Sequence, residues 1–189
     1  MKINITGHSR GIGKALYDLY VADGHEVTGF SRSNGYDITD PAVCKQIVQE
    51  SLDCDLFVNN AYAKFSQQEI MEDLYSNWQA LHDKTIVVIN SRSRFGNARN
   101  AVYSATKKEL HKKTIGMFID PEKCCRIISI SPGYVKTDMT QTVHHKQYNM
   151  LTPEQLGTMI KWCTDQPQNI EIGELSVWMN PNNGYIRRQ

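Results

Sequence analysis

Two side chains suited to proton transfer stand four residues apart in "YSATKKEL", residues 103–110. The stretch reads as the opening of a helix, so Tyr103 and Lys107 would lie one above the other on a single face. A free tyrosine has a pKa of about 10, and a nearby cation lowers that pKa, so such a pair could exchange protons nearer neutral pH. The alternative is a solvated surface pair, and other parts of the chain must decide between the two.

A glycine-rich turn near the N-terminus could hold a phosphate. In "ITGHSRGIGKAL", residues 5–16, the glycines at 7, 11 and 13 stand where a predicted strand hands over to a predicted helix. Glycine allows a tight turn and a close approach of backbone to a pyrophosphate, and the helix N-terminus offers free N–H groups and a positive dipole. The position at a strand–helix junction favours phosphate binding over an ordinary tight turn.

Strand-like and helix-like segments alternate along the chain, which predicts an α/β fold with a mostly parallel sheet covered by helices on both faces. Asp40 followed by Pro41 has the pattern of an N-cap and first helical position. We see no repeat or linker and expect residues 1–189 to form one domain. The expected strands are 2–6, 26–30, a very short 36–38, 55–60, 85–90, 125–131 and 175–179; the expected helices are 13–23, 41–52, 67–81, 101–118 and 153–163.

Composition excludes several classes of function. The 189 residues carry 21 basic and 20 acidic side chains without a basic stripe, so we expect neither nucleic acid nor a membrane surface as a partner. No apolar run approaches the length of about 20 residues that spans a bilayer. The five cysteines, and the pair His144 and His145, lack the spacing of metal ligands, so we expect no metal site. Cysteines that are neither paired nor metal-binding are typical of a reducing compartment, so we expect a cytoplasmic protein.

Four segments in one order now resemble the short-chain dehydrogenase/reductase family. They are "TGHSRGIG" at 6–13, "NNA" at 59–61, "YSATK" at 103–107 and "SPGYVKTDM" at 131–139. The resemblance runs nearly end to end, and the combination is far more specific than any one motif. It implies a Rossmann-type, doubly wound fold, a nicotinamide cofactor, and reversible hydride transfer between a carbonyl and an alcohol.

The resemblance implies three catalytic residues. Tyr103 would be the general acid in reduction, and Lys107 would lower its pKa and bind the nicotinamide ribose. A serine at the end of the strand at 85–90 would hydrogen-bond the carbonyl oxygen. Strand register favours Ser91 and spacing to the following glycine favours Ser93; we take Ser91, because the strand end is the more rigid platform.

The resemblance also implies how a dinucleotide would bind. The turn at 7–13 would hold the phosphates, Asp37 and the Ile38 backbone would meet the adenine, Asn59 and Ala61 would lie beside the adenosine ribose, and the loop at 132–137 would meet the nicotinamide. The cofactor-binding residues implied in this way are Gly7, Ser9, Arg10, Gly11, Ile12, Gly13, Ser31, Arg32, Asp37, Ile38, Asn59, Ala61, Tyr103, Lys107, Pro132, Gly133, Val135 and Thr137.

The residues after the second strand favour NADP(H). Members of the family that use NAD usually have an acidic residue there, which binds both ribose hydroxyls and would repel a 2′-phosphate. This chain has Ser31 and Arg32 instead, and Arg10 in the glycine turn resembles the second basic residue of NADPH-preferring members. We therefore expect NADP(H) as the cofactor.

The chain departs from the family pattern by being short. Asp37 follows Ser31 by only six positions, which leaves no room for the usual helix and predicts a shallower adenine pocket. Tyr62 replaces the usual glycine after "NNA". Only 24 residues separate Asn60 from Thr85, so the next helix is truncated. That helix normally supplies a catalytic asparagine; Asn77 does not fit its register and is not assigned.

Two functions follow from these residues. The first is an enzyme that reduces a small carbonyl compound or oxidises the corresponding alcohol, and the intact Tyr103 and Lys107 favour it. The second is a non-enzymatic NADP(H)-binding sensor or interaction protein that kept the fold; the trimmed elements favour it. We also expect a homodimer through the helix at 101–118, because that helix needs a cover on its outer face and the family uses it so.

Overall fold

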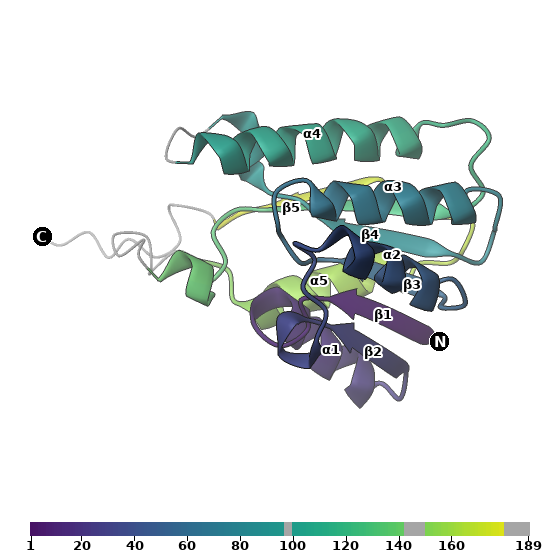
Figure 1. Cartoon of the computed structure of the whole chain (residues 1–189), viewed down its shortest axis with the longest axis horizontal. Helices are drawn as coiled ribbons and strands as arrows, with labels where there is room; N and C mark the ends of the chain where they lie inside the picture. Colours follow the sequence, from purple (N-terminus) through teal and green to yellow (C-terminus); the bar gives the residue numbers. More distant parts are fainter. Residues whose placement is uncertain (97–99, 142–149, 180–189) are drawn as a thin grey trace, which may run out of the picture.

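In the computed structural model, which describes residues 1–96, 100–141 and 150–179, six strands form one sheet (Figure 1). The strand order is β2-β1-β3-β4-β5-β6, and every neighbouring pair is parallel. The order reverses between β1 and β3, which is where doubly wound sheets bind ligands. The strands are β1 (Lys2–Thr6), β2 (Glu26–Phe30), β3 (Leu56–Asn59), β4 (Thr85–Ile89), β5 (Arg126–Pro132) and β6 (Glu174–Val177).

Helices cover both faces of the sheet (Figure 1). On one face α1 (Gly11–Ala22) packs against α5 (Pro153–Thr164). On the other, α3 (Ser66–Trp78) lies between α2 (Pro41–Glu50) and α4 (Ala101–Phe118). The predicted α/β architecture is confirmed. Short 3-10 turns connect the elements: η1 (Arg32–Asn34), η2 (Arg92–Phe95) and η3 (Asp138–Thr140).

Alternation along the central strands explains why two layers of helices form. In β4, Ile86 and Val88 contact the layer made by α2, α3 and α4, whereas Val87 and Ile89 contact the layer made by α1 and α5. All four are buried, as expected for a parallel strand with helices on both faces. Because each face of the strand has its own helix layer, the strand reads as a continuous apolar run.

The very short strand predicted at 36–38 is wrong. Tyr36 donates its backbone N–H to the Ser31 carbonyl, and Asp40 donates to the Asp37 carbonyl, so this backbone closes turns instead of a ladder. The Tyr36 ring packs edge-on against Phe30 with 4.8 Å between ring centroids. Six residues suffice for a turn but not for a crossover to a further strand. As a result β2 is the edge strand of the sheet.

Capping residues set where three of the helices begin. The Asp40 carboxylate accepts the Ala42 N–H at 2.8 Å, as the Asp-Pro pattern predicted. The Asn100 side chain accepts the Tyr103 N–H at 2.9 Å and so starts α4. Thr152 caps α5 reciprocally with Gln155. Each cap satisfies N–H groups that the helix itself leaves without partners.

The outer face of α4 bears on the expected homodimer. Lys108, Lys112 and Lys113 are exposed on it, and Lys113 pairs with Glu72 at 2.8 Å. Charged residues are depleted at the core of protein interfaces. The predicted dimer through this helix stays a prediction. Separately, no helix among the described residues has the length and apolar character that crossing a bilayer requires.

Truncating Leu74 tests the packing of α3 on the sheet. Leu74 is fully buried in the core that α2, α3 and α4 share. Leu74→Ala should lower the free energy of unfolding by about 2–5 kcal/mol, because it removes buried methyl groups and leaves a cavity. Urea unfolding followed by circular dichroism measures this. Asn77→Ala, on the exposed side of the same helix, is the control and should change stability by less than about 1 kcal/mol; equal effects would contradict the packing described.

Candidate active site

The start of α4 brings Tyr103 to the carboxyl end of β4. Ser91 follows this strand in extended conformation and is buried. Its side chain is hydrogen-bonded to the Tyr103 side chain. Ser93 instead gives its backbone N–H to the Ser91 hydroxyl at 3.1 Å. Of the two candidate serines, Ser91 is therefore the one that the fold places against the phenol.

Lys107 lies one helical turn further along α4 and is almost completely buried, with 3% of its surface exposed. Its ammonium donates to the Gln67 side-chain oxygen at 2.7 Å and to the Ile89 carbonyl at 2.8 Å. Its Nζ atom is 5.7 Å from the centre of the Tyr103 ring. The alternative of a solvated surface pair is therefore wrong, because the lysine is turned into the protein.

Burial decides the protonation of this pair. Desolvation lowers the pKa of Lys107 to about 7, since a low-dielectric interior disfavours its charged form. Desolvation also raises the pKa of Tyr103, and the hydrogen bond from Ser91 opposes that only in part. The sequence predicted a lowered pKa for Tyr103. In the protein without a bound cofactor the pKa is raised instead, so this prediction is wrong for that state. The sequence revealed the neighbouring cation but not that Lys107 is buried and Tyr103 partly buried.

Tyr62 adds a second phenol to this place. Its ring meets the Tyr103 ring edge-on, with centroids 4.8 Å apart, and the Lys107 ammonium is 5.5 Å from its centre. Its hydroxyl is 3.4 Å from the Thr106 hydroxyl. The side chain that stands where the family usually has glycine therefore contacts the tyrosine–lysine pair. Two rings and the ammonium form one packed group.

The glycine turn has the geometry of a phosphate cradle. Gly7 has a φ of +72°, which L side chains rarely adopt, and a Cβ at Gly13 would come 2.2 Å from the Gly7 carbonyl oxygen. Only glycine fits at either position. The N-cap of α1, Arg10, makes no side-chain cap, unlike the caps of α2, α4 and α5. The first N–H groups of α1 remain available to an anion, so the residues present fit a nucleotide phosphate.

Asn60 and Thr6 hold this turn against the end of β3. The Asn60 side chain donates to the Thr6 carbonyl at 2.9 Å, and the Thr6 hydroxyl accepts the N–H groups of Asn60 and Ala61 at 2.9 and 3.0 Å. Ala61 also lies 3.3 Å from where a Gly7 Cβ would stand. The sequence reading assigned Ala61 but missed Asn60, although its place in "NNA" was a signal.

Asn59 is turned away from the predicted cofactor surface. The residue has no exposed surface, and its side chain donates to the backbone carbonyl of Gln67 at 2.7 Å. Asn59 is opposite Val88 in the β3–β4 register, and Val88 faces the layer of α2, α3 and α4. The Asn59 side chain therefore ties β3 to α3, and the place of this residue beside the ribose stays a prediction.

The loop after β5 closes toward the glycine turn. The Thr137 methyl group lies 3.1 Å from where a Gly11 Cβ would stand, so this loop and the start of α1 are in contact. Val135 pairs with Leu151 in an isolated bridge and is buried. Gly133 donates its N–H to Val177 at 2.7 Å and has no room for a side chain beside Trp178. With Pro132 at the end of β5, the loop is fixed at both ends.

The predicted adenosine residues lie at the end of β2. Ser31 is buried and caps η1 through Asn34, whereas Arg32 is exposed. The Asp37 carboxylate accepts the N–H and hydroxyl of Thr39, both at 3.0 Å, and these hydrogen bonds lower its pKa. Ile38 is a core residue whose carbonyl accepts a hydrogen bond from the Cys44 thiol.

In the glycine turn at 7–13, Ser9 and Arg10 are exposed and Ile12 is half-buried. Arg10 pairs with Asp138 at 3.6 Å.

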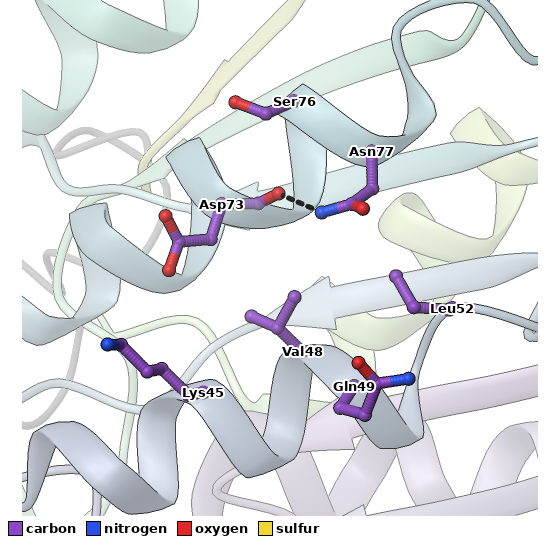
Figure 2. A pocket seen from close by; sticks show the side chains of 7 residues that line it. All are labelled: Lys45, Val48, Gln49, Leu52, Asp73, Ser76 and Asn77. Atoms are coloured by element: carbon purple, nitrogen blue, oxygen red, sulfur yellow. Dashed lines mark hydrogen bonds between the residues drawn. The ribbon is translucent and has the colours of Figure 1, made fainter.

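Asn77 lies at the other end of α3 from the site. Its side chain donates to the Asp73 carbonyl at 2.8 Å, beside an open groove between α2 and α3 (Figure 2). Gln67, near the N-terminal end of α3, contacts Lys107; ten residues at 1.5 Å per residue separate the two by about 15 Å. Leaving Asn77 unassigned agrees with this geometry. The groove is lined by Lys45, Val48, Gln49, Leu52, Asp73, Ser76 and Asn77.

Metal ligands do not gather in the part of the chain that the structure describes: no group of three or more His, Cys, Asp or Glu residues could hold an ion there. All five cysteines are free thiols, four of them buried. His144 and His145 lie outside the described residues. The reactive groups that the structure brings together are thus Ser91, Tyr103 and Lys107, with Tyr62 and Gln67 against them.

Comparison with known proteins identifies relatives along nearly the whole chain, although no family model matches it. Serine 3-dehydrogenase of Rhizobium radiobacter is 24% identical over 229 residues, which cover 93% of this chain and 92% of that protein. That span exceeds the 189 residues here, so the relative carries segments that this chain lacks.

Solved structures share the fold. The closed form of serine dehydrogenase complexed with NADP+ has a TM-score of 0.72 at 18% identity and covers 94% of both chains. A short chain dehydrogenase/reductase family protein has a TM-score of 0.78 at 20% identity, covering 94% of this chain and 95% of that one. 4-Hydroxyisoleucine dehydrogenase complexed with NADH has a TM-score of 0.78 at 19% identity, covering 94% and 96%.

Fold, sequence relatives and motifs agree with one another. The glycine turn, the Asn-Asn-Ala stretch and the Tyr-x-x-x-Lys helix occur in one order, and the fold places the last two at the carboxyl ends of neighbouring strands. The serine 3-dehydrogenase relative and two of the structural matches, each covering more than nine-tenths of this chain, are named dehydrogenases. In fold, in motif order and in sequence, the chain is similar to short-chain dehydrogenases/reductases.

Proposed function

We propose that this protein is an NADPH-dependent oxidoreductase that transfers hydride between the nicotinamide and a small carbonyl or alcohol substrate. The observation that carries the proposal is the Tyr103 phenol hydrogen-bonded to Ser91, with the Lys107 ammonium buried next to it. A protein that only sensed a dinucleotide would have no need of a proton donor, an oxygen-binding hydroxyl and a cation in one place.

The side chains divide the work as follows. The bound nicotinamide supplies or accepts the hydride. In reduction the carbonyl oxygen gains negative charge, the Ser91 hydroxyl stabilises it by hydrogen bonding, and the Tyr103 phenol gives it a proton. Lys107 in its charged form stabilises the phenolate that is left, because an opposite charge nearby favours the ionised state. In oxidation the same phenolate takes the proton of the alcohol.

The choice of NADP(H) rests on the end of β2. Arg32 is exposed there and no carboxylate is paired with it among the described residues, and Arg10 stands at the start of α1. The structural relatives include complexes with NADP+ and complexes with NADH, so the fold is compatible with either cofactor. Asp37 is close enough for Arg32 to lower its pKa, but the residue that follows β2, where an acid would bind both ribose hydroxyls, is Ser31. An exposed arginine next to this serine favours the 2′-phosphate.

The substrate we propose carries a carboxylate near the reacting carbon. Arg92 directly follows Ser91, and its guanidinium stacks on the Trp178 ring with 3.3 Å from the charged carbon to the ring centre. In residues 1–96, 100–141 and 150–179 it forms no ion pair, whereas its neighbour Arg94 pairs with Glu174. Two relatives are named as dehydrogenases of serine and of 4-hydroxyisoleucine, and both compounds carry a hydroxyl and a carboxylate. A guanidinium that is fixed by stacking on an aromatic ring can bind a carboxylate through two parallel hydrogen bonds.

Cofactor preference is measured by titrating NADPH and NADH into the protein and following fluorescence. NADPH should bind at least about 100-fold more tightly, since two charge-assisted contacts of about 1.5–3 kcal/mol each favour the 2′-phosphate. Arg32→Ala should weaken NADPH binding by about tenfold or more and leave NADH binding unchanged. Equal affinities for the two cofactors would refute the preference, and so would unchanged NADPH binding in the variant.

The proton-transfer role predicts a selective loss in Tyr103→Phe. The variant should lower kcat about 10²–10⁴-fold, the usual contribution of general acid catalysis, while its NADPH affinity stays close to that of the parent. Ser91→Ala should reduce turnover more than Ser93→Ala does, which makes the Ser93 variant the matched control. Consumption of NADPH is followed against a panel of small aldehydes, ketones and oxo acids. Turnover at the parent rate in the phenylalanine variant would overturn the role.

The carboxylate prediction is tested with Arg92→Met. Oxidation of a 3-hydroxy acid such as serine is compared with oxidation of its methyl ester, which lacks the carboxylate. The variant should lower kcat/KM for the acid by about 10–100-fold, because it removes a charge-assisted contact, and should leave the ester within about twofold. An equal loss for both substrates would mean that Arg92 acts through the fold alone. Tight NADPH binding without turnover of any substrate would instead favour the sensor.

A further inference from the structure

The Gln67 side chain accepts a hydrogen bond directly from the Lys107 ammonium. It lies in the first turn of α3, has 1% of its surface exposed, and places its side-chain oxygen 2.7 Å from the lysine ammonium. The next residue, Gln68, does not contact the lysine in this way; its side chain donates to the Glu72 carboxylate at 3.1 Å. One of two successive glutamines is therefore committed to the lysine.

The orientation of the Gln67 amide is fixed by its other contacts. Its side-chain nitrogen donates to the carbonyls of Asn59 and Ile89, at 2.8 and 3.0 Å. Because both partners are acceptors, they must face the NH₂ group, and the oxygen is left to face Lys107. The Asn59 side chain completes the network by donating to the Gln67 backbone carbonyl at 2.7 Å.

Around the ammonium, acceptors are few. Among the described residues, the groups in contact with Nζ are the Gln67 oxygen, the Ile89 carbonyl and the rings of Tyr62 and Tyr103. No carboxylate of α3, α4 or β4 in that part of the chain pairs with it. The Ile89 carbonyl belongs to the sheet, so Gln67 is the one side-chain acceptor that sequence change could remove.

We infer that Gln67 is a positioning residue that holds Lys107 in place and favours the charged form of its ammonium. The inference rests on the proposed function in one respect, namely that a charged Lys107 serves cofactor binding and proton transfer. It also explains how this shortened chain manages without an assigned asparagine on α3: a side chain at the helix start contacts the lysine directly, and Asn77 at the far end does not.

The sign of the effect follows from the contacts. A hydrogen bond to the charged form of a group favours that form, so Gln67 opposes the desolvation that lowers the pKa of Lys107 to about 7. Without this acceptor the pKa falls further. A glutamine that only tied α3 to the sheet would affect unfolding and leave the titration of Lys107 where it is.

The experiment follows the lysine itself. Protein labelled with ¹³C at the lysine ε-carbons is titrated by NMR, with Lys107→Met used to assign the signal. Gln67→Met, and Gln67→Asn as the variant that keeps an amide but is too short to reach, should each lower the midpoint by about one pH unit. Gln68→Met is the matched control and should leave it unchanged. An unmoved midpoint in both folded Gln67 variants would overturn the inference.

Cofactor binding gives a second readout. If charged Lys107 holds the cofactor, the Gln67 variants should bind NADP+ about tenfold more weakly than the parent at about pH 8 and almost equally at about pH 5.5, where the lysine is protonated in all of them. A constant ratio across pH would contradict the inference. Failure of the proposed function is distinguishable, because Lys107→Met would then bind NADP+ like the parent while the NMR midpoint still shifts in the Gln67 variants.

Discussion

A lysine ammonium buried at the end of a parallel sheet is the constraint around which this site is arranged. Lys107 gives up almost all contact with water, and the acceptors it gains are one amide oxygen and one backbone carbonyl. Above about pH 7 the folded protein leaves this lysine neutral, whereas the unfolded chain keeps it charged up to about pH 10.5. Folding stability therefore rises with pH across that window, and at neutral pH the buried lysine costs about a few kcal/mol. A residue that destabilises the fold in this way is better explained by function than by packing.

The same lysine explains why the elements around it cannot move independently. The Ile89 carbonyl accepts from both Lys107 and Gln67, Gln67 also donates to Asn59, and Asn59 donates back to Gln67. Helix α4, helix α3 and the ends of β3 and β4 are joined by these bonds. A buried polar network is favourable only when its members find partners, and then it specifies one arrangement. Ser91 and Tyr103 lie next to this network, on the same strand end and helix, and are therefore held in place by it.

The sequence predicted what depends on local pattern and failed where burial decides. Strand and helix order, the Asp40 cap and the close approach of Gly7 and Gly13 follow from periodicity, capping chemistry and sterics. The strand at 36–38 failed because three residues with β character cannot pair when their backbone is already closing turns. The sequence did not show that the Asn59 side chain contacts α3 whereas the Asn60 side chain contacts the end of β1, because adjacent strand residues face opposite sides and the motif alone does not fix the register. Gln67 could not have been found from spacing, since 40 positions separate it from Lys107.

Shortening of the chain has removed cover at the edge of the sheet and left the centre intact. The segment after β2 is a single 3-10 turn, so the side of the site that would hold adenosine is built on an edge strand, with an exposed arginine as its charged group. The opposite side has Ser91 just after β4, Tyr103 and Lys107 on α4, and a loop after β5 that contacts the glycine turn. Binding energy at the adenosine end can come from electrostatic contacts with phosphates, which need no deep pocket. Proton transfer, by contrast, needs groups held to within fractions of an ångström, which only the packed centre provides. The parts that were kept are those whose chemistry depends on rigidity.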